Sequence, residues 1–237
     1  MGKIRTIISN WKLQTLILFI FFTVGIIGHY WDYTYPLMVL LTPYVILISG
    51  IWAIHKCLKK KYLVLWIILA YIVTFFLEVI GVSQGFIFGP YYYGDILGPK
   101  LFDVPVIIGL NWVFIILSLT LLSEWLVNLL FKSRFNAKIK AFFTAVFTAT
   151  LATFFDFLME PAAVGLNYWI WTLTAEPLNI PIQNYIAWFL ISFVFAFTFF
   201  LISKEKRIKL QKSPHSPWFV LIQATFFIAI RIILFIN

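Results

Sequence analysis

Residues 55–81 read HKCLKKKYLVLWIILAYIVTFFLEVIG, a lysine-rich tract followed by an apolar run that is interrupted near its end by one acid, Glu78. A helix needs about 20 mostly apolar residues to cross a bilayer, and residues 63–81 meet that requirement. Lysines collect at the water-facing borders of such helices. The stretch therefore predicts a membrane-spanning helix that begins beside a basic loop.

Six further stretches have the same length and apolar character. The chain has 237 residues, of which 62% are hydrophobic and 11% charged, whereas soluble domains are nearer half apolar and a quarter charged. The first stretch is expected to be a retained helix and not a signal peptide, because no small-residue cleavage site follows it. The seven expected spans are residues 13–31, 35–54, 63–81, 104–130, 141–160, 185–203 and 217–236. The predicted fold class is all-α, a polytopic transmembrane helical bundle that forms a single domain over residues 1–237.

Lysine and arginine are distributed unevenly along such a bundle. Of the 18 such residues, 16 lie in the N-terminal segment or in the loops after spans two, four and six, which all face one side. Only Lys100 and Arg231 lie on the other. Because positive residues collect on the cytoplasmic side, we expect a multi-pass protein of the bacterial inner (cytoplasmic) membrane with its N-terminus in the cytoplasm. This distribution explains the net charge of +9 better than nucleic-acid binding does.

The connection after the third span, residues 78–105, is unusual in composition. Glycines recur at positions 81, 85, 89, 94 and 98, and prolines at 90, 99 and 105 exclude one continuous helix. The segment is also too apolar and aromatic for an ordinary solvated loop. Irregular backbone at membrane depth must be buried in protein or line a cavity. We therefore expect a broken or re-entrant segment packed against the bundle; an ordered cap with a purely structural role is the alternative.

Asp156 and Glu160 lie four residues apart in the fifth expected span, so both carboxyls share one helix face. Pro161 is expected to bend or end that helix. Carboxyls in an apolar span are costly unless they face a cavity or share partners. Because two like charges this close do not both ionise easily, one of the pair is expected to be a neutral acid near neutral pH. The structural alternative is that one of them bonds backbone groups freed near Pro161.

Two aromatic motifs follow, residues 167–171 and 181–188. Most of their tryptophans fit an aromatic belt at the membrane interface, and Asn184 fits a helix cap. The chain has one cysteine, Cys57, and three scattered histidines. We therefore expect neither a metal site nor a cofactor.

Together these motifs resemble the membrane carotenoid hydratases. The pattern is Glu78-x2-Gly81-x3-Gly85-x2-Phe88-Gly89-x-Tyr91-x-Tyr93 with Gly98 and Pro105, then Asp156-x3-Glu160-Pro161, Trp169-x-Trp171 and Pro181-x2-Asn184-x3-Trp188. The resemblance covers most of spans three to six. It departs from the family pattern at Glu160, where the family usually has aspartate, so the reach of that carboxyl differs.

The resemblance implies a hydro-lyase of carotenoid biosynthesis, which adds water to the terminal double bond of an acyclic carotenoid end group and gives a tertiary hydroxyl. Asp156 is then expected to be the acid, and Glu78 or Glu160 the base. Aromatic faces would stabilise the intermediate cation. The carotenoid would come from the lipid bilayer, with water as co-substrate and other carotenoid-pathway enzymes as partners. The expected substrate-binding residues are Gly85, Phe88, Gly89, Tyr91, Tyr93, Trp169, Trp171 and Asn184.

Three other functions fit parts of the sequence. A carotenoid end-group cyclase or isomerase also begins by protonating an alkene, although the Pro-x-Glu-Glu signature of the small membrane cyclases is absent. A membrane transporter would line a path across the bilayer with polar residues and often shows internal repeats, which the chain does not show. A non-enzymatic scaffold for carotenoid enzymes is the third.

Overall fold

The computed structural model describes residues 10–131, 136–172, 180–202 and 215–236. This part of the chain contains seven helices that are long and apolar enough to cross a membrane, which confirms the expected number. The second helix has the expected bounds, and the ends of the other six differ from the expected ones by a few residues. The helices are α2 (Trp11–Tyr30), α3 (Tyr35–Ile54), α4 (Lys61–Gln84), α5 (Val106–Phe131), α6 (Ala137–Gly165), α7 (Ile182–Ile202) and α8 (His215–Ile236).

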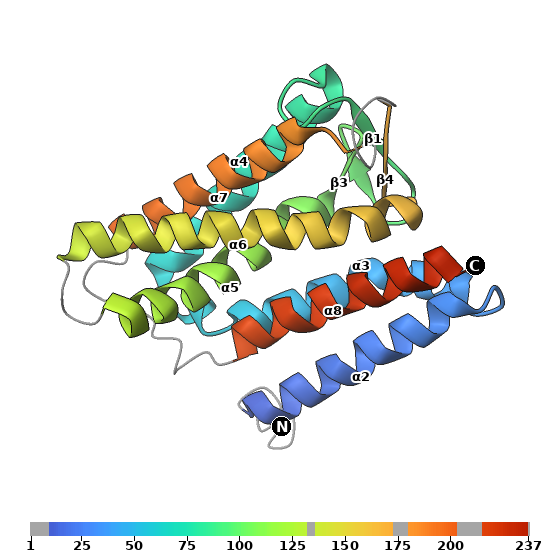
Figure 1. Cartoon of the computed structure of the whole chain (residues 1–237), viewed down its shortest axis with the longest axis horizontal. Coiled ribbons are helices and arrows are strands. Elements are labelled where there is room, and N and C mark those ends of the chain that lie inside the picture. The colour runs from blue at the N-terminus through green and yellow to red at the C-terminus, as the bar shows by residue number, and fades with distance from the viewer. Residues whose placement is uncertain (1–9, 132–135, 173–179, 203–214, 237) are drawn as a thin grey trace.

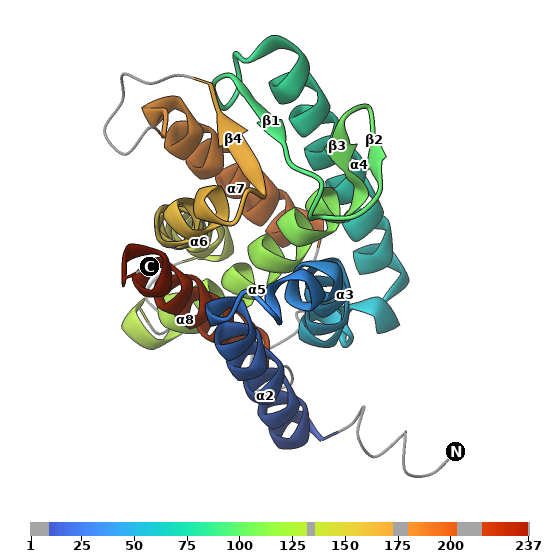
Figure 2. The same cartoon turned by 90° about the vertical axis from the view of Figure 1, so that its right-hand side faces the viewer.

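Helix α5 lies at the centre of the bundle (Figure 2). In its most apolar stretch 78% of the residues are buried, the largest share among the seven helices. It packs against α3, α4, α6 and α8. Close approach to α3 depends on Gly50, because a Cβ atom there would lie 1.9 Å from the Phe114 ring. The outer helices carry exposed large apolar side chains such as Phe19, Leu40 and Leu65, as expected for a surface in contact with lipid.

Two short antiparallel strand pairs lie at one end of the bundle (Figure 1). β1 (Tyr91–Tyr93) pairs with β4 (Trp169–Trp171), and a small hairpin joins β2 (Lys100–Leu101) to β3 (Val104–Pro105). The strands were not expected from the sequence. The β1–β4 pair joins segments that are far apart in the chain, so no local sequence pattern predicts it. It ties the connection after α4 to the connection after α6.

The connection after α4 is broken in the way its glycines and prolines predict. Helix α4 ends at Gly85, whose φ of 69° is the left-handed conformation that favours glycine at a helix end. The rest of the segment forms turns and the short strands, and it packs into the core through Phe88 and Leu97. A re-entrant path through a membrane stays a prediction.

Helix α6 differs from the expectation at Pro161. Of the two expected effects, an end of the helix at Pro161 is wrong, because α6 continues to Gly165; a bend stays a prediction. Proline removes one backbone hydrogen bond, but its fixed φ is compatible with a helix. The final turn is closed by hydrogen bonds from the Leu166 amide to the Ala162 carbonyl and from the Tyr168 amide to the Ala163 carbonyl.

Apart from Lys100 in β2 and Arg231 near the end of α8, the described basic residues lie near the end of the bundle opposite to the strands. Lys56 and Lys59 precede α4 and Lys138 lies in the first turn of α6, whereas β1 and β4 follow the far ends of these two helices. The remaining basic segments, residues 3–5, 132–134 and 204–212, lie outside the described residues.

Candidate functional site

The three carboxyls singled out by the sequence line one cavity beneath the β1–β4 pair. Glu78 comes from the last turns of α4, and Asp156 and Glu160 come from one face of α6. All three are buried, Asp156 completely so at 0% exposure. The cavity has a volume of about 40 Å³. Its lining consists of Glu78, Phe88, Tyr91, Tyr93, Ile108, Asn111, Trp112, Asp156, Met159, Glu160, Trp169, Trp171, Asn184 and Trp188.

Glu78 accepts hydrogen bonds from three aromatic side chains. The Trp112 indole nitrogen lies 2.6 Å from Glu78 Oε1, the Tyr93 hydroxyl lies 2.8 Å from Oε2, and the Tyr91 hydroxyl also donates to Oε2. Burial first, and the negative charge of Glu78 second, raise the pKa of both tyrosines well above its usual value, so both remain donors. Both oxygens of Glu78 therefore act as acceptors, the hydrogen-bonding pattern of an ionised carboxylate.

Glu160 is held in a similar way by the other strand. The indole nitrogens of Trp169 and Trp171 lie 3.1 Å and 3.0 Å from Glu160 Oε2. Glu160 Oε1 accepts from the side-chain amide of Asn184, at 3.2 Å. Both oxygens of this carboxyl are thus also occupied as acceptors.

The strand pair explains how four aromatic side chains reach two carboxyls. Residues two apart in a strand point to the same face, so Tyr91 and Tyr93 share a face of β1, and Trp169 and Trp171 share a face of β4. Tyr91 lies opposite Trp171 and Tyr93 opposite Trp169, with ring centroids 5.1 Å and 6.1 Å apart. The β1–β4 pair therefore covers the cavity with aromatic rings whose polar atoms bind Glu78 and Glu160.

Asp156 is bound differently from the other two acids. Its Oδ2 accepts from the Asn184 side-chain amide at 2.7 Å, so Asn184 bridges Asp156 and Glu160. Its Oδ1 is buried and has no hydrogen-bond partner among the described residues. Of the six oxygens of the three carboxyls, Asp156 Oδ1 is the one that no described residue engages. This oxygen is therefore a candidate for a proton transfer.

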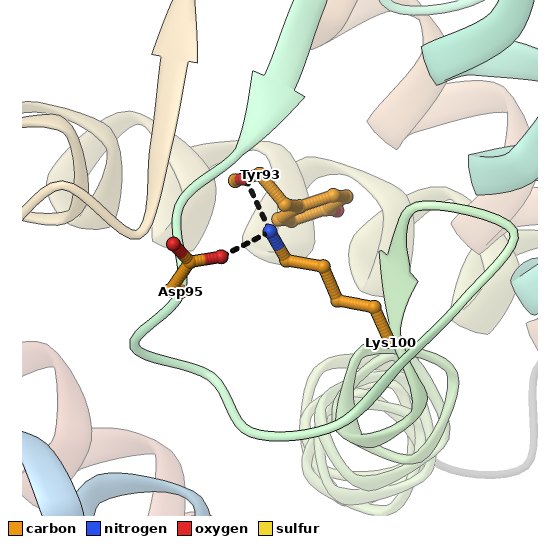
Figure 3. Close-up of polar contacts among 3 residues, drawn as sticks. All are labelled: Tyr93, Asp95 and Lys100. Carbon is orange, nitrogen blue, oxygen red and sulfur yellow. Dashed lines mark hydrogen bonds and ion pairs between the residues drawn. The ribbon is translucent and has the colours of Figure 1, made fainter.

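A lysine fixes β1 from outside the cavity (Figure 3). Lys100 Nζ donates to the Tyr93 backbone carbonyl at 2.8 Å and to Asp95 Oδ1 at 2.7 Å. The hydrogen bond and the positive charge of Lys100 lower the pKa of the exposed Asp95 carboxyl. Because Lys100 holds the backbone of Tyr93, it helps to aim the Tyr93 hydroxyl at Glu78.

The structure brings most of the expected site residues together. Phe88, the two tyrosines, the two tryptophans and Asn184 all line the cavity with the three acids. Gly85 and Gly89 do not line it. Gly85 ends α4, and Gly89 has a φ of 106° and lies so close to Pro181 that a Cβ atom would be 2.6 Å from its Cγ. These two glycines shape the backbone around the cavity.

Sequence reasoning missed Asn111 and Trp112 of α5. An amide within an otherwise apolar span is itself unusual, and that signal could have drawn attention to Asn111. Trp112 stacks on Trp188, with ring centroids 3.9 Å apart, and so joins α5 to α7 at the cavity wall. Among the described residues, no group of three or more His, Cys, Asp and Glu side chains is placed to hold a metal ion.

Comparison with known proteins adds two findings. A family model described as "Carotenoid biosynthesis protein" matches residues 34–237. Bisanhydrobacterioruberin hydratase from Haloarcula japonica is 36% identical over 117 residues, which are 48% of this chain and 36% of that protein. The match thus covers little more than a third of the relative's length. No solved structure matches the chain.

Proposed function

This chain belongs to the carotenoid biosynthesis protein family, and we propose that it adds water to the terminal double bond of an acyclic carotenoid end group. The product is a tertiary alcohol. The relative named as a hydratase supports the reaction class. The observation that carries the proposal is Asp156 Oδ1, a buried oxygen to which no described residue donates a hydrogen bond, on a residue that lines a largely aromatic cavity.

Proton transfer comes first. The Asp156 carboxyl gives its proton to the CH carbon of the terminal double bond, and the two electrons of the π bond form the new C–H bond. The neighbouring carbon, which carries two methyl groups, becomes a tertiary cation, and Asp156 becomes a carboxylate. Because the Asp156 carboxyl is buried, bulk water does not reach the cation, and only water within the cavity can react with it.

The cavity walls stabilise the cation. The faces of Trp112, Trp188 and the β4 tryptophans supply cation–π attraction, worth about 0.5–2 kcal/mol each. Glu78 and Glu160 add negative charge that is already oriented by its hydrogen bonds and needs no reorganisation when the cation forms. We therefore propose that these two glutamates are electrostatic stabilisers.

Water addition completes the reaction. The water oxygen bonds to the cationic carbon, and one water proton passes to Asp156, which is thereby restored to its acid form. We favour Asp156 in both proton transfers over a separate base, because both oxygens of Glu78 and of Glu160 are already engaged as acceptors. This role for Asp156 differs from the expectation from the sequence, in which Glu78 or Glu160 was the base.

The size and position of the cavity suggest how the substrate binds. A volume of about 40 Å³ has room for water molecules but is far too small for a whole carotenoid. We propose that the polyene stays in the lipid while its end enters between the helices. With the N-terminus in the cytoplasm, the cavity lies near the non-cytoplasmic face of a bacterial cytoplasmic membrane.

Expression in cells that accumulate lycopene tests the function. We expect pigments that gain one or two molecules of water by mass. An end-group cyclase would instead give an isomer of the same mass as lycopene. Activity of the purified protein on lycopene separates an enzyme from a scaffold, and pigment that is unchanged in both assays would contradict the proposed function.

A further inference from the structure

A second unpaired oxygen belongs to another residue that lines the same cavity as Asp156. Asn111, on α5, lines the cavity, and its side-chain Oδ1 is buried without a hydrogen-bond partner among the described residues. Asp156 comes from α6, which packs directly against α5. Buried polar atoms are normally matched by protein, water or a ligand, because leaving them unpaired destabilises the fold. Two such oxygens on residues that line one cavity could bind one small polar molecule between them.

The cavity has the room and the chemistry for water. A bound water needs about 10–15 Å³ and two to four polar partners, and the cavity offers about 40 Å³. An amide oxygen accepts hydrogen bonds, and so does Asp156 Oδ1 once its proton has gone to the alkene. One water molecule has two O–H groups and can donate one to each oxygen. Its lone pairs then remain free to attack the cation.

We infer that Asn111 Oδ1 and Asp156 Oδ1 together bind the water molecule that adds to the carotenoid end group. This inference rests on the proposed hydratase function and deepens it. In the addition step a water lone pair forms the C–O bond. The O–H bond toward Asp156 breaks and its proton returns to the carboxylate, while the O–H group toward Asn111 remains as the hydroxyl of the product.

Protonation of the alkene and addition of water are separate steps, and one substitution can impair the second while the first continues. Replacement of Asn111 by leucine, a side chain of similar size, removes a water ligand and leaves Asp156 in place. The alkene should still be protonated, but the cation should lose a proton again instead of capturing water. In D2O this reversal introduces deuterium into recovered lycopene. Hydration by Asn111→Leu should fall about tenfold or more, while deuterium exchange into lycopene continues.

Ser118→Ala is the matched control. Ser118 lies further along α5, and its hydroxyl is also buried without a partner among the described residues, but it does not line the cavity. Membranes holding equal amounts of each variant are incubated with lycopene in D2O, and mass analysis gives both hydrated product and deuterium content. Ser118→Ala should match the unaltered protein in both measurements.

Each outcome decides a separate point. Hydration and exchange that fall together in Asn111→Leu, or hydration that does not fall, would overturn the role of Asn111. Unaltered protein that shows neither hydration nor exchange would instead contradict the proposed function. If Asn111→Leu does not accumulate in membranes, Asn111→Gln displaces the same amide by one carbon. It should lower the ratio of hydration to exchange, and an unchanged ratio would overturn the inference.

Discussion

Hydrogen bonding distinguishes the three buried acids from one another. Glu78 and Glu160 each accept from three side-chain donors, whereas Asp156 keeps one oxygen unengaged by the described residues. The spacing of Asp156 and Glu160 was enough to place both on one face of a helix. Nothing in the sequence could assign the donors, because Tyr91, Trp112 and Asn184 reach the acids only after strands and helices from four parts of the chain have packed.

Removing one donor to Glu78 should weaken catalysis without unfolding the protein. Tyr93→Phe deletes one hydroxyl and leaves the ring against Trp169. A hydrogen bond to a charged group contributes about 1.5–3 kcal/mol, so hydrated product should form about 10 to 100 times more slowly. Tyr92→Phe is the control, because Tyr92 lies between the two tyrosines in β1 but is 52% exposed and does not line the cavity. Equal rates for the two variants would contradict the role given to the Glu78 donors.

At the scale of elements, the strand pair and its glycines position the cavity wall. The break after α4 could be predicted, because prolines and glycines act locally on the backbone. The β1–β4 pairing could not, since three-residue strands are stabilised by each other and not by their own sequence. The sequence also left open whether Pro161 bends or ends α6, because the loss of the single hydrogen bond that proline removes can be outweighed by the packing of the final turn.

Gly89 should be more sensitive to substitution than Gly98, another glycine of this connection with a positive φ. An alanine there would be strained at a φ of 106°, and its Cβ would lie 2.6 Å from Pro181 Cγ. We expect Gly89→Ala to destabilise the protein by about 2–4 kcal/mol. Gly98→Ala carries similar backbone strain at a φ of 85°, but its Cβ would make an ordinary contact, 3.6 Å from Pro43. Thermal unfolding in detergent should therefore show a larger loss for Gly89→Ala, and the reverse order would contradict this account of the close approach.

At the scale of the whole molecule, the lengths of the apolar stretches predict the number of helices. The positions of lysine and arginine predict the orientation in the membrane. Seven long helices were expected, and the described residues contain seven. Membrane orientation and the extent of the single domain stay predictions. The central place of α5 could not be predicted, because every span is similarly apolar and only packing shows that α5 is buried on nearly all sides.

The proposed orientation can be tested with single introduced cysteines. Native Cys57 should react little, because it is buried and burial raises its pKa to about 12. Asp95 is 99% exposed at the strand end of the bundle, so Asp95→Cys should react with a membrane-impermeant maleimide in intact spheroplasts. Lys60→Cys, at the opposite end, should react only after permeabilisation. The opposite pattern of labelling would show that the N-terminus is outside.

We propose that Asp156 protonates the carotenoid alkene. Replacing one oxygen of its carboxyl group tests this role most directly. Asp156→Asn keeps the shape of the side chain but removes the acid, and a general acid contributes about 10²- to 10⁴-fold to rate. Asp103→Asn makes the same change at an exposed aspartate outside the cavity. In lycopene-accumulating cells with equal protein levels, hydrated pigment should be lost in Asp156→Asn and retained in Asp103→Asn. Hydrated pigment at unaltered levels in Asp156→Asn would contradict the account.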